Sequence, residues 1–295
     1  MTRATRSSDR STVRLGILWM LVAQLLFFAG NAVAKHLAET YPVPLVIWAR
    51  LAFQMLLLAP LLPRLRPLLV TRRMGMQVVR AAFLVSSTGF FYLAIHILPL
   101  ADASAILYIA PLLITVLSMP LLGERVGAWQ WVAVAIGFAG ALIVIRPGVD
   151  FLQPALVIPL AAALGFAFVQ ISSRSLGRTD PPMTTFVHTT IVSALLASAA
   201  VPFFWITPSV EGWVTMAAIG VLSGGGQFAM IKAFAWAPAA VVAPFNYTGL
   251  VWAILFGFFV FGEIPDIWII LGATLITTSG LYIFRREHPV PGTPG

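Results

Sequence analysis

Cysteine is missing from the 295-residue sequence, which excludes disulfide bonds, thiolate metal sites and a cysteine nucleophile. Charged residues are also scarce: they make up 9% of the chain, whereas an ordinary soluble domain has about 25%. Hydrophobic residues make up 60% of the chain, and the mean hydropathy is +0.95. A chain this short of polar side chains cannot cover a surface in water, so most of it is expected to lie in lipid.

Catalytic motifs are missing as well. The sequence contains no HExxH, no GxxxxGKS/T, no GxSxG and no carboxylate cluster suited to a metal ion. All Asp and Glu residues fall in tails, loops or the ends of apolar runs, which argues against proton coupling through a buried carboxylate. The net charge of +8 is spread over short loops, so nucleic acid is not an expected partner. We therefore expect neither an enzyme nor an ATP-driven pump, and no cofactor.

What the chain does contain is a series of apolar runs separated by short loops. Most of the runs have about 20 residues, the length that an α-helix needs to cross the hydrocarbon core of a bilayer. Polar tails flank them at 1–14 and 287–295. The sequence therefore predicts an all-α integral membrane protein with ten transmembrane helices, at about 15–34, 44–62, 76–98, 101–122, 128–145, 151–173, 183–204, 213–236, 239–261 and 267–284.

One stretch of the chain occurs twice. Residues 99–146, moved by 139 positions without a gap, fall on residues 238–285 with eight of 48 identities. The identities include Tyr108 with Tyr247 and the Gly-Glu dipeptide at 123–124 with that at 262–263. Each copy reads as an apolar helix, a Gly-Glu turn and a second apolar helix. A fixed-offset repeat of this kind organises the whole fold.

The repeat divides the predicted spans into two halves, residues 15–147 and 148–286, with five spans each. Because five is odd, the second half enters the membrane from the opposite side. Such an inverted repeat is typical of secondary transporters, in which two pseudo-symmetric halves exchange conformations.

The arginines and lysines indicate the orientation. With the N-terminus in the cytoplasm, 14 of the 18 basic residues lie on the cytoplasmic side, and only Lys35 and Arg146 lie outside. Arg50 and Lys232 fall within spans. An excess of basic residues in short cytoplasmic loops is the usual pattern, so both termini are predicted to be cytoplasmic, in a bacterial inner membrane.

Polar and aromatic side chains inside the predicted spans are the candidates for substrate binding. Arg50 lies about six residues into its span, where a cation is costly, so it is expected either to hold a substrate carboxylate or to extend to the headgroups. Amides in lipid need partners, from a ligand or from a neighbouring helix, and aromatic rings either stack on a ligand or pack. The other candidates are Asn31, Tyr92, Tyr108, Gln170, Gln227, Asn246, Tyr247 and Trp252.

Small residues and proline suggest where helices are interrupted. Residues 86–89, which end in Gly89, fall on residues 225–228 under the same offset, and we expect a helix interruption and hinge there, at Gly224, Gly225 and Gly226 in the second half. Close packing of small residues is the alternative. Pro111 predicts a further hinge, in the first half only, because its repeat partner is Leu250.

The Gly-Glu turns are expected to serve the helices that follow them. Glu124 and Glu263 precede the last span of each half, and a carboxylate at a helix N-terminus is stabilised by the helix dipole.

These motifs resemble the EamA branch of the drug/metabolite transporter superfamily. The resemblance rests on residues 101–109 with Pro111, on 122–125, on 137–147, and on 261–263 and 272–285 in the second copy, and it covers nearly all of 14–286. It implies ten helices in a five-plus-five inverted repeat, with a central cavity lined mainly by helices 1, 3, 4, 6, 8 and 9. Similar proteins move amino acids, riboflavin, other metabolites or drugs without ATP.

The expected function is secondary transport of a small organic metabolite, such as an amino acid, in the direction of export. Uptake of a vitamin such as riboflavin is the alternative, and a membrane enzyme or a non-transporting scaffold is an alternative of another class. The small-molecule substrate and the lipid bilayer are the expected partners, and a homodimer is left open.

Overall fold

The computed structural model describes residues 10–122, 128–145, 154–177, 179–236 and 243–287, and every regular element within them is a helix. In chain order these are α1 (Arg10–Thr40), α2 (Val43–Gln54), η1 (Met55–Arg64), α3 (Leu65–Leu68), α4 (Met74–Ile97), α5 (Leu100–Leu107), α6 (Ala110–Leu122), α7 (Ala128–Ile145), α8 (Pro154–Leu176), α9 (Pro182–Ala200), η2 (Val201–Phe204), α10 (Val210–Trp236), η3 (Ala243–Tyr247), α12 (Thr248–Phe261) and α13 (Ile267–Glu287).

The described helices are suited to a bilayer by both length and surface. Six segments are apolar and long enough to cross a membrane: Thr12–Thr40, Met74–Ile97, Leu100–Leu121, Val157–Leu176, Pro182–Phe204 and Val210–Trp236. Shorter apolar helices lie at Val43–Ala59, Val134–Ile143, Phe245–Phe261 and Ile267–Ser279. Large apolar side chains point outward, such as Phe203 (84% exposed) and Phe259 (76% exposed). The prediction of an all-α membrane protein is therefore confirmed for the described residues.

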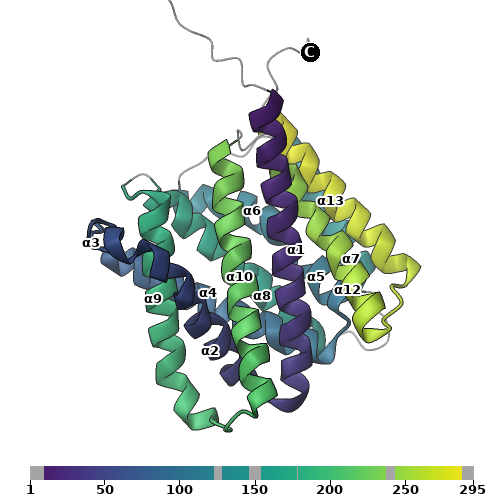
Figure 1. The fold of residues 1–295 in the computed structure, drawn as a ribbon. Helices are drawn as coiled ribbons and strands as arrows, with labels where there is room; N and C mark the ends of the chain where they lie inside the picture. The colour runs from purple at the N-terminus through teal and green to yellow at the C-terminus, as the bar shows by residue number, and fades with distance from the viewer. Residues whose placement is uncertain (1–9, 123–127, 146–153, 178, 237–242, 288–295) are drawn as a thin grey trace, which may run out of the picture.

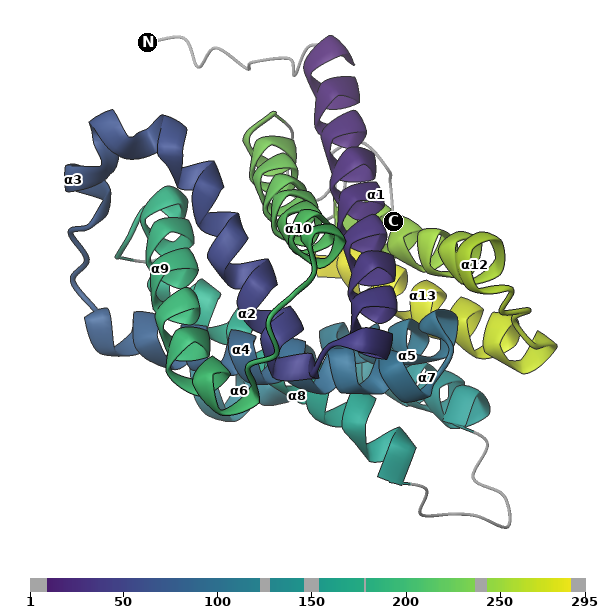
Figure 2. The ribbon, with the colours of Figure 1, turned by 60° about the horizontal axis from the view of Figure 1, so that its bottom comes forward.

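The helices pack mainly in long pairs. α1 lies along α10, α4 along α8, and α7 along α13 (Figures 1 and 2). α2 packs between α9 and α10, and α12 packs on α1 and α5. The largest core, which includes Phe28, Leu45, Tyr92 and Met216, lies where these pairs meet. The first turn of α1 and the last turn of α13 lie at the same end of the bundle (Figure 1). We call it the terminal end, and the opposite one, near the last turn of α1, the Lys35 end.

Glycine allows these helix pairs to approach closely. A Cβ on Gly30 of α1 would lie 3.0 Å from the Ser223 hydroxyl of α10, and a Cβ on Gly165 of α8 would lie 3.0 Å from the Ser87 Cβ of α4. A Cβ on Gly140 of α7 would lie only 2.8 Å from the Gly272 backbone oxygen of α13. Small residues at contact faces stabilise helix pairs in lipid, where no hydrophobic effect drives them together.

The predicted interruption at residues 86–89 and 223–228 is wrong. α4 and α10 continue through these residues without a break. In lipid an interrupted helix must find other partners for its backbone groups, whereas small residues in an intact helix gain contacts at no such cost. Gly224 packs on Gln54 and Leu57, Gly226 on Phe27, and Gly225 and Gly89 face Leu26 and Ile47.

The α7–α13 contact makes a testable prediction. We expect Gly140→Ala to lower the melting temperature of the detergent-solubilised protein, because the new methyl group would meet a backbone oxygen that cannot rotate away. Overpacking of this kind costs about 1–3 kcal/mol. Gly75→Ala is the matched control, since nothing lies within 4 Å of its Cβ position. Equal melting temperatures for the two variants would contradict close α7–α13 packing.

Candidate functional site

Two stretches of the chain that depart from α-helix face each other inside the bundle. In the first half α5 ends at Leu107 and α6 begins at Ala110, with Tyr108 as the C-cap of α5. In the second half the 3₁₀ turn η3 ends at Tyr247 and α12 begins at Thr248. The two tyrosines are repeat partners, 139 positions apart. The chain therefore departs from α-helix near Pro111, between α5 and α6, and in the second half a 3₁₀ turn stands directly before α12, with Leu250 at the position equivalent to Pro111. The hinge at Pro111 stays a prediction.

Pro111 stands in the first turn of α6. A proline is tolerated there because the N–H that it lacks would have no acceptor within the helix. Backbone bonds bridge the break instead: the Ile109 N–H donates to Ile106 O at 3.1 Å, and the Leu112 N–H donates to Ile109 O at 2.9 Å. The N–H groups of Tyr108, Ile109 and Leu112 are thus all satisfied at the break.

Tyr108 and Tyr247 lie against each other. Their ring centroids are 5.5 Å apart. Tyr108 Oη donates to the Asn246 backbone oxygen at 2.9 Å, and Gln24 Nε2 donates to Asn246 Oδ1 at 2.7 Å. Gly249 makes room for this arrangement, since a Cβ there would overlap Tyr108 Oη and lie 2.6 Å from Gln24 Oε1. We call these five residues the tyrosine-pair cluster.

A second polar group surrounds Arg50 of α2. Arg50 Nη1 donates to Tyr92 Oη at 3.0 Å, and the guanidinium carbon lies 5.6 Å from the Tyr92 ring centroid. One turn further on, Gln54 Nε2 donates to Gln227 Oε1 at 3.4 Å and to Thr190 Oγ1 at 3.3 Å. We call these five residues the arginine cluster. Arg50 thus points inward to α4 and not to the headgroups.

The charge of Arg50 is not neutralised by a carboxylate within the described part of the chain. Neither ion pair found there includes it, and its buried Nε has no acceptor. A half-buried cation in this condition is costly, and an anionic ligand would offset the cost.

The remaining candidates are placed differently. Asn31 of α1 and Gln170 of α8 are half-buried, and the described residues supply no hydrogen bond to either side chain, so their amides are free to meet a ligand. Trp252 lies near Phe256, with ring centroids 6.3 Å apart, and packs on the largest core together with Tyr108. Tyr92 of the arginine cluster is part of the same core, so the core connects the arginine cluster with the tyrosine-pair cluster.

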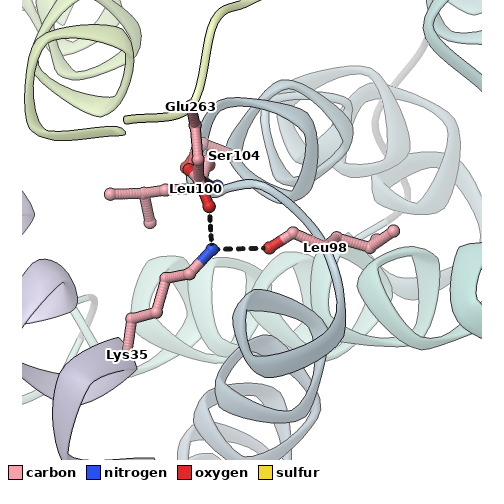
Figure 3. Close-up of polar contacts among 5 residues, drawn as sticks. All are labelled: Lys35, Leu98, Leu100, Ser104 and Glu263. Atoms are coloured by element: carbon pink, nitrogen blue, oxygen red, sulfur yellow. Dashed lines mark hydrogen bonds and ion pairs between the residues drawn. The ribbon is translucent and has the colours of Figure 1, made fainter. Parts of the chain in front are cut away.

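At the Lys35 end an ion pair ties three elements together. Lys35 of α1 donates to a Glu263 carboxylate oxygen and, at 2.9 Å, to the Leu98 carbonyl at the end of α4 (Figure 3). The second Glu263 oxygen accepts the Leu100 N–H, in the first turn of α5, at 2.8 Å. We call Lys35, Glu263, Leu98 and Leu100 the Lys35 knot.

Glu263 therefore does not serve the helix expected for it. Its carboxylate caps the N-terminus of α5, from another part of the chain, and not the N-terminus of α13. Gly262 explains the geometry: with φ of +67° it ends α12, and the Glu263 N–H turns back to Gly257 O at 2.9 Å. Glu124, its repeat partner, lies outside the described residues.

A buried polar group also lies between α4, α8 and α9. Arg80, 8% exposed, donates from Nε to Ser173 Oγ at 2.7 Å and from Nη1 to Thr189 Oγ1. Beside it, in the α8–α9 turn, Asp180 accepts hydrogen bonds from Thr71, the Arg72 N–H and Gln77. Burial alone would raise the pKa of Asp180, but these hydrogen bonds and the attraction to a nearby histidine hold that pKa below its ordinary value.

Sequence reasoning missed Gln24, Gln54 and the pairing of Lys35 with Glu263. A signal for two of these was present in α1. Gln24, Phe28, Asn31 and Lys35 recur at spacings of four, three and four, so they lie on one face of the helix. No spacing rule could join this face to Asn246 or Glu263, which lie more than 200 residues away. Among the described residues no group of three or more His, Asp or Glu could hold a metal ion.

Apolar, membrane-length helices around a polar interior define a multi-pass membrane protein. A comparison with family models identifies the family: the EamA-like transporter family model matches residues 14–146 and again 153–285. The chain belongs to the EamA-like transporter family.

Known relatives of the chain are transporters of different metabolites. A riboflavin transporter of Vibrio cholerae is 30% identical over 278 residues, which cover 92% of this chain and 93% of the relative. An S-adenosylmethionine uptake transporter of Rickettsia bellii is 25% identical over 94% and 95% of the two chains. A pseudopaline exporter of Pseudomonas aeruginosa is 27% identical over 93% and 98%. One crystal structure superposes with a TM-score of 0.64 at 18% identity, over 92% of this chain and 98% of that one, which shows the fold alone.

Proposed function

We propose that this protein is a secondary transporter that moves a small organic metabolite with a carboxylate group, an amino acid or similar compound, by alternating access. The observation that carries the proposal is the contact between Tyr108, where α5 gives way to α6, and its repeat partner Tyr247, in the 3₁₀ turn directly before α12. Irregular backbone at corresponding positions of two halves is typical of the substrate sites of such proteins. The transporter relatives support this reading over an enzyme or a scaffold.

We propose ten spans, made of the six long segments and the four shorter ones, in two inverted halves at 15–147 and 148–286. The α7–α13 contacts support this arrangement. Gly137 meets Ser279 and Gly140 meets Ile276, and a shift of 139 positions exchanges these two contacts. From the first contact to the second, the residue number rises along α7 and falls along α13, so the two helices run antiparallel. The last spans of two inverted halves would also run antiparallel.

The α1–α10 and α4–α8 pairs support the same symmetry with a slightly different register. The Gly30–Ser223 contact corresponds to Gly165–Ser87, with offsets of 135 and 136 positions. In this register Gln170 is no longer the partner of Asn31, so we propose that each serves its own side of the substrate path.

We propose that both termini are cytoplasmic and that the membrane is the bacterial inner membrane. Two observations support this orientation. The start of α1 and the end of α13 lie at the same end of the bundle (Figure 1), and the sequence places 14 of 18 basic residues on that side. The Lys35 end then faces outward.

We propose that substrate binds between the arginine cluster and the tyrosine-pair cluster. The unneutralised Arg50 charge would take a carboxylate, with Tyr92 holding the guanidinium in place. The amides of Gln24 and Asn246 and the faces of the two tyrosines would take the rest of the molecule. Pro111 would serve as a hinge, whereas the contacts of Gly89, Gly224, Gly225 and Gly226 favour a packing role.

Riboflavin uptake is the second candidate function. The neighbouring rings of Tyr108 and Tyr247 and the 30% identity to a riboflavin transporter favour it, because a flat ring system stacks on aromatic side chains. Export, expected from the sequence, stays a prediction, since the relatives include both uptake and export proteins.

The test is flux in proteoliposomes loaded with amino acids, riboflavin and other metabolites, with and without a proton gradient, and with mass spectrometry as the readout. We expect one class of carboxylate-bearing solute to leave the vesicles, and we expect Asn246→Ala to slow it. Selective release of riboflavin would favour the second candidate. A folded protein that moves no solute from this pool would contradict the proposal and favour a scaffold or an enzyme.

A further inference from the structure

The Lys35 knot joins parts of the chain that belong to different halves. Lys35 and the Leu98–Leu100 junction come from the first half, and Glu263 comes from the second. Both charged side chains are mostly buried, with 11% of Lys35 and 19% of Glu263 exposed. Water therefore screens the pair much less than it would screen a surface ion pair.

Each charge also complements a helix end. The Lys35 ammonium meets the carbonyl of Leu98, the C-cap of α4, where the helix dipole is negative, and lies 5.1 Å from the Phe261 ring centroid. The Glu263 carboxylate meets the Leu100 N–H, the first of α5, where the dipole is positive. The pair thus holds α1, the α4–α5 junction and the end of α12 together at one end of the bundle (Figure 3).

We propose that the Lys35–Glu263 pair is the outer gate of the transporter, closed in this structure. This inference rests on the proposed function, because alternating access requires contacts between the halves that break when one face opens. Opening at the Lys35 end would move the end of α12 away from α1 and from α5. That motion separates Lys35 from Glu263 and frees the Leu100 N–H.

Ser104 gives the gate a reporter. It lies one turn into α5 from Leu100, is fully buried, and is drawn behind Glu263 in Figure 3. Because the chain has no cysteine, the Ser104→Cys variant carries a single thiol. In right-side-out vesicles a membrane-impermeant thiol reagent should label it slowly. Adding Lys35→Met or Glu263→Gln should raise the labelling rate about tenfold or more, as expected when one partner of a buried pair is removed.

Matched controls separate the gate from general loosening. Glu211→Gln removes an exposed carboxylate at the same end of the bundle, and Lys232→Met removes a lysine near Phe228 on α10. Neither should change the labelling rate. The Lys35→Met/Glu263→Gln double variant should label no faster than the faster single variant, because both changes break the same contact.

The labelling assay needs no substrate, so it can fail or succeed independently of the flux assay. Faster labelling from outside in Lys35→Met supports the gate even if Glu263→Gln fails to fold. Unchanged labelling in both variants, an equal increase in the controls, or an increase found only in inside-out vesicles would each overturn the outer gate. If the protein transports substrate but both variants are labelled at the normal rate, the proposed function stands and the gate is overturned.

Discussion

Arg50→Ala lowers substrate flux by about 100-fold or more while the protein still inserts and folds: this is the first result that we expect. Removing one member of a buried charged hydrogen-bonded pair costs about 2–5 kcal/mol. Here the member removed is Arg50, and the partner left unpaired is the proposed substrate carboxylate. Tyr92 keeps its place in the core without Arg50 because it is fully buried among apolar neighbours. Initial rates in proteoliposomes at matched protein density measure the effect.

Two further variants make the Arg50 prediction specific. Arg50→Lys keeps the charge but loses the planar fork that can hold both Tyr92 and a carboxylate, so we expect intermediate flux. Arg66→Ala removes an exposed arginine from the short helix α3 and should transport normally. Normal flux in Arg50→Ala, with the substrate known to carry a carboxylate, would remove Arg50 from the binding site.

Gly249→Ala should abolish transport and lower the melting temperature as well. The added methyl group would overlap Tyr108 Oη and come within 2.5 Å of Phe28 Cε2 and 2.6 Å of Gln24 Oε1. The three groups come from two other helical segments and are held by hydrogen bonds and packing, so they cannot all withdraw. Overpacking in a tight core costs about 1–3 kcal/mol, and here it also separates the tyrosine pair.

The Gly249 effect can be traced to one atom. Tyr108→Phe removes the hydroxyl that the new methyl group would overlap, so Gly249→Ala/Tyr108→Phe should recover part of the lost melting temperature. Gly75→Ala, with open space around its Cβ position, is the control and should behave like the unmodified protein. Normal transport by the Gly249→Ala single variant would contradict the close approach of α12 to Tyr108.

The site was only partly predictable from the sequence. Asn246, Tyr108 and Tyr247 were identified as polar or aromatic residues inside apolar runs, and the structure brings them into contact. Residues 223–228 were wrongly predicted as an interruption, because glycine serves equally as a helix breaker and as a contact surface for a second helix. The choice depends on whether another helix lies within a few ångströms, as α1 and α2 do here.

Glu263 illustrates the same limit for charges. Its place after Gly262 predicted a turn correctly, since a left-handed glycine commonly ends a helix. Its position before α13 suggested the wrong partner. A carboxylate binds whichever unsatisfied N–H groups the fold brings closest, and those of α5 are 163 residues away in the chain.

The sequence by itself indicated that the chain enters a membrane as apolar helices, because charge is scarce and apolar runs of about 20 residues have the length at which a helix crosses the bilayer with its backbone groups satisfied internally. It also determined that one unit occurs twice, since identities at a fixed offset need no structure to be seen. Only the tertiary structure decided that Arg50 points to Tyr92, that the two tyrosines meet, and that Lys35 pairs with Glu263. Local spacing fixes which face of a helix a side chain occupies, but the partner across that face comes from a distant segment through helix packing.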